Sequence, residues 1–238
     1  MSAGQTAVTG TSSHVIRRSD TVRASRLSPP GRTRHRCRDD AKDGRVLPTL
    51  KQQLRQEIEE RRSRRSEAER DRSAAALAEW MYACPFRLEY DVTVAAHVPV
   101  GNEPGSNSML DALVDRGVSV LVPVVPEGGP APLDWAPYTG PDSLTSGRWG
   151  LLEPSTDRVG VTAIRAASVI LVPALAIDKS GVRLGRGAGY YDRTLHGLSA
   201  DLVGVVYDDE VVDSLPSGDH DVPVGWTLTP GDGFRRLG

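Results

Sequence analysis

The sequence predicts a single α/β domain, with a mainly parallel sheet flanked by helices. Two near-continuous apolar runs, SVILVP (168–173) and LVGVVY (202–207), are typical of strands buried on both faces of a parallel sheet. Two further β-rich runs, at 92–98 and 118–124, are separated by a segment with helical spacing of its apolar residues, as in a βαβ unit. A chain of 238 residues suits one such domain with an extension.

Two helices are expected before the sheet. Thr49 with Gln52 predicts a capping box at the start of the first helix, and Ser66 with Glu69 predicts one for the second, whose apolar part is 75–81. Apolar residues recur four apart on one face of the first helix, at Leu50, Leu54 and Ile58.

Three further elements complete the expected domain. Residues 125–147 are rich in Pro, Gly and Asp, which indicates irregular chain around one short strand, LDWAPY (133–138). A helix is expected to begin within GYYDRTLHGL (189–198), and WTLTP (226–230) is expected to be the last strand, at an edge of the sheet.

The first 46 residues differ in composition from the rest. They hold ten Lys or Arg against four Asp, with almost no apolar periodicity, so we expect residues 1–46 to be a disordered extension and 47–238 to be the domain. Asp39, Asp40 and Asp43 in this extension argue against an organellar transit peptide. The net charge of −2 gives no reason to expect nucleic-acid binding, and no apolar run approaches the ~20 residues of a membrane helix.

Cysteine and histidine usage excludes some classes of protein. Cys37 and Cys84 make neither a disulfide framework nor a zinc site, which fits a reducing cytoplasm. The five histidines have no ligand spacing to one another, so we expect no structural metal, and His97 and His220 are interpreted as structural. We expect a monomer.

The string RLGRGAGYYD (183–192) is the strongest candidate for a functional site. Glycine allows positive φ and lets a ligand approach the backbone amides, which can form an anion-binding concavity. Arg186 adds a positive charge with fork geometry suited to phosphate, and Asp192 supplies oxygen ligands of the kind Mg²⁺ prefers. The string therefore indicates binding of a nucleotide's phosphates.

Other interpretations of the string remain open on spacing. A P-loop requires Gly-Lys followed by Ser or Thr, which this chain lacks. A dinucleotide fingerprint needs a third glycine where Tyr190 stands, but Asp209 lies 20 residues beyond Gly189 at a strand end, so a dinucleotide-binding oxidoreductase stays possible. A tight glycine turn without a ligand, with Tyr190 and Tyr191 in the core, is the third interpretation.

Four segments together resemble the 5-formyltetrahydrofolate cyclo-ligase family, also called methenyltetrahydrofolate synthetases. They are KQQLR (51–55), RWGLLEP (148–154), VPALAIDKSGVRLGRGAGYYDRTL (172–195) and LPSGDHDVPV (215–224), in the family's order, and the resemblance covers about 48–230. It implies an α/β fold and an ATP- and Mg²⁺-dependent reaction. That reaction converts 5-formyltetrahydrofolate to 5,10-methenyltetrahydrofolate and releases ADP and phosphate.

The resemblance also implies roles for individual residues. ATP would be bound by Lys51, Arg55, Gly185, Arg186, Gly187, Gly189 and Tyr191, with Arg186 also catalytic; Mg²⁺ would be bound by Asp192 and Asp221; the folate would be bound by Val98, Glu103, Trp149 and Tyr190. A carboxylate such as Glu103 can accept paired N–H bonds from an aminopyrimidine edge, and Trp149 and Tyr190 could stack on flat rings.

Two departures from the family pattern stand out. Glu-Pro-Gly-Ser (103–106) replaces the common Glu-Val-x-Thr, and Glu210 stands where a glutamine is common, which adds a negative charge. Both motivate an alternative of a different class, a non-catalytic protein that binds and sequesters the folate.

Overall fold

A computed structural model of the chain describes residues 43–88, 90–147 and 152–238. Most of the predicted extension 1–46, and Trp149, lie outside the described residues. The first helix, α1 (Asp43–Ser63), begins before the expected capping box, so Thr49 lies inside it. The second helix, α2 (Glu67–Tyr82), begins as expected, with a capping box between Ser66 and Glu69.

The central sheet confirms the predicted α/β class. In the described part of the chain, seven strands form this sheet in the order β12-β11-β9-β6-β1-β2-β3. Their bounds are β1 (Thr93–Ala96), β2 (Ser119–Val124), β3 (Asp134–Tyr138), β6 (Ala167–Pro173), β9 (Asp201–Val205), β11 (Trp226–Thr229) and β12 (Gly233–Arg236). The five strands from β11 to β2 are parallel, while β12 and β3 are antiparallel edges. The expectation that 226–230 forms an edge strand is therefore wrong, because β12 covers β11.

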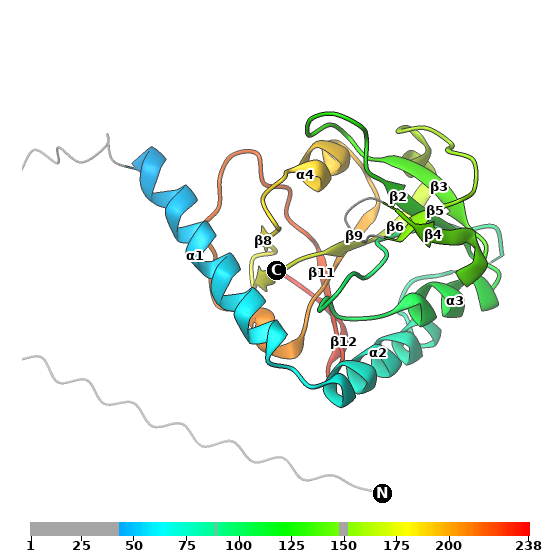
Figure 1. The fold of residues 1–238 in the computed structure, drawn as a ribbon, viewed down its shortest axis with the longest axis horizontal. Coiled ribbons are helices and arrows are strands. Elements are labelled where there is room, and N and C mark those ends of the chain that lie inside the picture. The colour runs from blue at the N-terminus through cyan, green and yellow to red at the C-terminus, as the bar shows by residue number, and fades with distance from the viewer. Residues whose placement is uncertain (1–42, 89, 148–151) are drawn as a thin grey trace, which may run out of the picture. The chain divides into compact units, whose positions relative to one another are not determined.

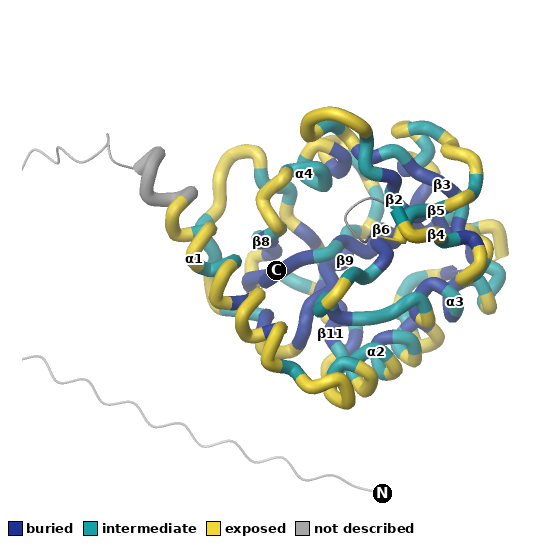
Figure 2. Tube along the Cα trace, viewed as in Figure 1, coloured by how far each residue is buried: buried dark blue, intermediate teal, exposed yellow. Residues whose placement is uncertain are grey.

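Helices cover both faces of the sheet, as buried parallel strands require. On β6, Val169 and Leu171 pack toward α2 and α3 (Asn107–Asp115), whereas Ile170 and Val172 belong to a second apolar cluster with Leu195 of α4 (Tyr190–Leu195). Figure 1 shows α2 and α3 side by side, with α4 in a different part of the domain. Figure 2 shows the strands between them as mostly buried.

Smaller strands lie outside the central sheet. They are β4 (Leu144–Ser146) paired with β5 (Leu152–Pro154), and β7 (Ala176–Asp178) paired with β8 (Arg183–Leu184) and β10 (Val211–Val212). Helix α1 packs Leu54 and Ile58 against Leu175 and Leu184 beside this second group. Leu50, expected on the same buried face, is 43% exposed.

The strand order reverses between β1 and β6. From β1 the chain continues to β2 and β3 on one side, and from β6 it continues to β9 and β11 on the other. Ligands of open α/β sheets bind outside the carboxyl ends of the strands at such a reversal. Sheet topology alone therefore predicts a ligand site beside the residues that follow Ala96 and Pro173.

Candidate active site

A cavity of about 470 Å³ opens at this reversal. Its wall includes His97 and Val98 after β1, Val125 after β2, and Ala174 and Leu175 after β6. The volume lies within the range of small-molecule sites, which is roughly 300–1,000 Å³.

Every predicted site residue that the structure describes lines this one cavity. They are Lys51, Arg55, Val98, Glu103, Gly185, Arg186, Gly187, Gly189, Tyr190, Tyr191, Asp192 and Asp221. Trp149 cannot be placed, since it lies outside the described residues. The fold thus joins α1, the turn after β1, the glycine-rich string and the segment before β11, which are far apart in the sequence.

Helix α1 holds the glycine-rich turn in place through Arg55. The Arg55 Nε–H donates to the carbonyl oxygen of Gly185 over 2.8 Å. Gly187 has φ of +102°, and a Cβ placed on it would lie 3.2 Å from Cζ of Arg55. Glycine at 187 therefore permits both the left-handed backbone and the close approach of the guanidinium.

Each predicted Mg²⁺ ligand is paired with a cation. Lys51 Nζ lies 2.5 Å from Asp221 Oδ2, and Arg183 Nη2 lies 2.5 Å from Asp192 Oδ1. Burial raises the pKa of the Asp221 carboxyl, but hydrogen bonds from Lys51 and from the Gly218 N–H outweigh it, so the pKa is lowered overall. Asp221 is thus held as an anion at neutral pH.

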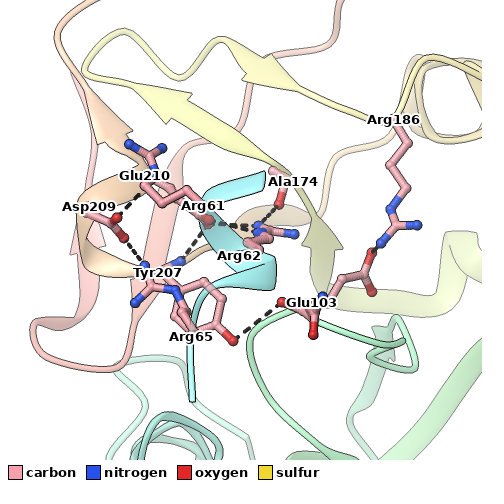
Figure 3. A network of polar contacts seen from close by, with 10 residues as sticks. Arg61, Arg62, Arg65, Glu103, Ala174, Arg186, Tyr207, Asp209 and Glu210 are labelled. Atoms are coloured by element: carbon pink, nitrogen blue, oxygen red, sulfur yellow. Dashed lines mark hydrogen bonds and ion pairs between the residues drawn. The ribbon is translucent and has the colours of Figure 1, made fainter. Parts of the chain in front are cut away.

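Arg186 and Glu103 meet across the cavity (Figure 3). Arg186 Nη2 lies 3.1 Å from Glu103 Oε1, and Glu103 Oε2 accepts a hydrogen bond from the Val100 N–H over 3.0 Å. The glutamate side chain is only 8% exposed, whereas that of Arg186 is 56% exposed. Both carboxylate oxygens of Glu103 are therefore already engaged.

The altered turn after Glu103 is well formed. Gly105 has φ of +100°, and a Cβ there would lie 2.4 Å from Sδ of Met109. Ser106 then caps α3, because its side chain accepts from the Ser108 N–H. The Pro-Gly-Ser replacement accordingly supplies a tight turn and a helix cap rather than a disrupted site.

Sequence reasoning missed several residues of the cavity wall, among them the polar residues Arg183, Glu153 and His97, the last of which was interpreted as structural. Arg183 Nε and Nη1, His97 Nε2 and the Tyr191 hydroxyl are buried and have no hydrogen-bond partner among the described residues. Burial lowers the pKa of His97 and raises that of Tyr191. Buried polar atoms are rarely left unpaired, so these four atoms are suited to contact a ligand in the cavity. A signal for Arg183 was present, since it begins the string that contains Arg186.

The added charge of Glu210 is compensated inside the protein. Its carboxylate forms two hydrogen bonds of 2.7 Å with the Arg62 guanidinium. Asp209, on which the dinucleotide interpretation depended, instead forms ion pairs with Arg61 and Arg65. That carboxylate is therefore engaged with α1 and the turn that follows it.

None of the helices in the described part of the chain combines the length and apolar character needed to cross a bilayer. Cys84 is a free thiol.

Comparison with known proteins places the chain in a family. The model of the 5-formyltetrahydrofolate cyclo-ligase family matches residues 48–230. A protein of Mycolicibacterium smegmatis named 5-formyltetrahydrofolate cyclo-ligase is 44% identical over 197 residues, which are 81% of this chain and all of that protein. The Escherichia coli K12 protein of the same name is 30% identical over 58% of this chain and 78% of its own length.

Solved structures give the same result. The NMR structure of 5,10-methenyltetrahydrofolate synthetase from Aquifex aeolicus has a TM-score of 0.66 and 31% identity, covering 79% of this chain and 93% of its own. The Mycoplasma pneumoniae synthetase, at 20% identity and a TM-score of 0.57 over 74% of this chain and 96% of its own, shares the fold. From its family-model match and its 44% identity to a named cyclo-ligase, this chain belongs to the 5-formyltetrahydrofolate cyclo-ligase family of enzymes.

Proposed function

We propose that this chain catalyses the ATP- and Mg²⁺-dependent conversion of 5-formyltetrahydrofolate to 5,10-methenyltetrahydrofolate, with release of ADP and phosphate. The observation that carries the proposal is one cavity at the strand-order reversal, whose wall combines Lys51 and Arg55 of α1, the glycine-rich turn with Arg186, and Glu103. Relatives named for this reaction support the same assignment.

The ATP half of the cavity is assigned to α1 and the glycine-rich turn. Lys51 and Arg55 are four residues apart and share one helix face, from which they can reach the same phosphates. Arg186 is half-exposed and has a single ion-pair partner among the described residues, so its guanidinium can turn toward a phosphate. The unpaired nitrogens of Arg183 add donors to the same wall.

The folate half is assigned to the turn after β1. Glu103 is a buried carboxylate able to accept N–H bonds from the aminopyrimidine edge once Arg186 leaves it. Val98 and Tyr190 supply apolar and aromatic surface beside it, and Trp149 remains a proposed ring contact outside the described residues.

The donor set of the cavity fits Mg²⁺ carried by a triphosphate. In the described residues no group of three carboxylate, histidine or cysteine side chains is gathered as a protein-only metal site would need. Mg²⁺ usually takes one or two carboxylates and completes its shell with water and substrate phosphates, which matches Asp192 and Asp221. When bound, the ion would neutralise charge on the phosphate oxygens.

The proposed chemistry proceeds in two steps. The formyl oxygen attacks the terminal phosphorus of ATP, the bond to the bridging oxygen breaks, and ADP leaves. N10 of the folate then attacks the activated formyl carbon, the carbon–oxygen bond breaks, phosphate departs and N10 loses its proton. Arg186 would stabilise the transferring phosphoryl group, while Glu103 and the aromatic wall would hold the pterin in position.

A spectrophotometric assay tests the proposal. Purified protein with Mg·ATP and 5-formyltetrahydrofolate should develop the absorbance of the methenyl product, and omission of ATP should abolish it. Folate binding without ATP-dependent turnover would instead support the sequestering alternative. Quenching of nicotinamide fluorescence would support the oxidoreductase alternative.

We propose the cytoplasm as the compartment and a monomer as the working form. The free thiol of Cys84 is in keeping with a reducing compartment. Sedimentation of the purified protein would test the monomer.

A further inference from the structure

Arg62 and Glu210 form a buried ion pair beside the active-site cavity (Figure 3). Arg62 Nε donates to Glu210 Oε1 and Nη2 donates to Oε2, each over 2.7 Å. The two side chains are 3% and 0% exposed. Arg62 belongs to α1 and Glu210 follows β9, so the pair joins elements 148 residues apart.

The pair also contacts the cavity wall and the end of β9. Arg62 Nη2 donates to the carbonyl oxygen of Ala174 over 2.7 Å, and Ala174 lines the cavity directly after β6. Glu210 Oε2 accepts from the Tyr207 N–H over 2.9 Å. The guanidinium of α1 is therefore fixed against the carboxyl ends of two adjacent strands of the central sheet.

Helix geometry connects this anchor to the proposed ATP contacts. Residues 51, 55 and 62 are separated by four and seven positions, so their side chains leave α1 on one face. Lys51 lies 11 residues from Arg62, which is about 16 Å along a helix at 1.5 Å per residue. A shift or rotation at Arg62 would therefore move Lys51 and Arg55 relative to the glycine-rich turn.

The apolar contacts of α1 fix its register less specifically than directional hydrogen bonds do. Near the cavity the helix packs Leu54 and Ile58 against Leu175 and Leu184. Such contacts are non-directional, whereas the fork of hydrogen bonds between Arg62 and Glu210 requires one orientation. A buried pair of this kind adds little net stability compared with apolar residues of similar volume, so its contribution lies more in placement.

We propose that Arg62 and Glu210 are positioning residues for the ATP half of the site, holding α1 in the register that presents Lys51 and Arg55 to the phosphates. The inference rests on the proposed function. Neither residue lines the cavity, so both act through α1 and Ala174 rather than by touching a substrate.

The first test removes the planar guanidinium of Arg62 but keeps a positive charge at that position. Arg62→Lys retains a cation for Glu210 but cannot reproduce the planar fork and the bond to Ala174 together. We expect the Kd for Mg·ATP, measured by titration calorimetry, and the KM for ATP each to rise roughly tenfold or more, because small misplacements are costly. The KM for the folate should change less than about threefold. Asp232→Asn, which removes an exposed ion pair with Arg235, is the control and should leave all three constants unchanged.

A double variant separates positioning from stability. Arg62→Met with Glu210→Leu removes both charges, so neither is left buried without its partner and the melting temperature should fall less than in either single variant. The Kd for Mg·ATP should nevertheless remain raised.

Wild-type Mg·ATP affinity in the double variant, or in Arg62→Lys, would overturn the positioning role while leaving the proposed function intact. Wild-type protein that forms no methenyl product would overturn the proposed function itself.

Discussion

The guanidinium of Arg186 pairs with the carboxylate of Glu103, with 3.1 Å between Nη2 and Oε1. These residues are proposed to bind different substrates, the phosphates of ATP and the pterin of the folate. Without ligands each residue neutralises the other, so each substrate must compete with this contact. Arg186 is the more exposed partner, so we expect it to be the one that moves.

Loss of Arg186 should slow turnover more than it weakens folate binding. Arg186→Ala removes the cation proposed to stabilise the transferring phosphoryl group, so kcat should fall roughly 10²-fold or more. The affinity for 5-formyltetrahydrofolate should be unchanged or higher, because Glu103 loses its competitor. Steady-state kinetics with fluorescence titration of the folate measures both, and unchanged kcat would refute the catalytic role.

Loss of the Glu103 charge should weaken folate binding and should not weaken ATP binding. Glu103→Gln keeps the shape of the side chain but supplies one acceptor oxygen where the pterin edge needs two. The KM for the folate should rise by roughly 10-fold or more, as for hydrogen bonds to a charged group. ATP affinity should stay the same or improve as Arg186 is released. A raised KM for ATP with unaltered folate KM would contradict this assignment.

Loss of the Asp192 charge should raise the concentration of Mg²⁺ that activity requires. Asp192→Asn weakens a proposed Mg²⁺ ligand, so the Mg²⁺ concentration at half-maximal activity should rise. The same change removes the charge opposite the buried Arg183, so a fall in melting temperature is also expected. Lys51→Met, which frees Asp221 from its pair, is a useful comparison, since it should affect ATP more than the metal. An unaltered Mg²⁺ titration of Asp192→Asn would remove Asp192 from the metal site.

Replacement of Gly187 by alanine should destabilise the protein and weaken ATP binding. Its φ of +102° is unfavourable for a side chain, and the new Cβ would lie 3.2 Å from Cζ of Arg55. Gly187→Ala should lower the free energy of unfolding by about 1–3 kcal/mol and weaken ATP binding through displaced Arg55. Gly129→Ala is the control, because Gly129 has no positive φ and its Cβ would meet nothing within 4 Å among the described residues. Equal midpoints of urea unfolding for Gly187→Ala and Gly129→Ala would contradict the expected backbone strain at residue 187.

Protonation of the Asp178 carboxyl should make the free energy of unfolding depend on pH in the acid range. Burial raises the pKa of its carboxyl, but hydrogen bonds from the Ser180 hydroxyl and from the N–H groups of Leu215, Val182 and Ser180 outweigh burial and lower the pKa overall. The stabilisation is therefore fully present above the usual aspartate pKa of ~3.9 and is lost as pH falls through the lower folded value.

Urea unfolding of wild type and Asp178→Asn tests this dependence. At pH 7 the variant should lose about 1–3 kcal/mol, because an amide cannot accept all of these bonds. The difference between the two proteins should narrow as pH falls below ~4. Asp213→Asn, which removes a largely exposed partner of Lys179, should change little at any pH. A difference that does not vary with pH would argue against the titration of Asp178.

Elements with strong local signals were predictable from the sequence. The capping box at Ser66 forms because its partners are three residues apart, and the apolar runs at 168–173 and 202–207 became β6 and β9 because alternate residues pack on both faces. The start of α1 and the edge position of β11 were predicted wrongly. The second error arose because an edge is defined by the absence of a pairing strand, and β12 carries no long pattern of its own.

At the site, too, local features were predictable from the sequence and contacts between distant segments were not. Residues 185–192 lie in one string, so their proximity follows from the sequence. The family resemblance led to Lys51, Arg55 and Glu103, but not to their pairing with Asp221, the Gly185 carbonyl and Arg186. His97 was missed because nothing local distinguishes a cavity-lining side chain from a core one, whereas Arg183 was overlooked although it begins the glycine-rich string.

What the sequence by itself determined is local: the left-handed glycines of the turn, the cap of α2 and the alternation that buries β6. What only the tertiary structure decided is which distant charges meet, above all Arg62 with Glu210 and Glu103 with Arg186. Backbone preferences depend on a residue and its near neighbours, whereas the partner of a buried charge depends on which segments the packed sheet and α1 bring within hydrogen-bond distance.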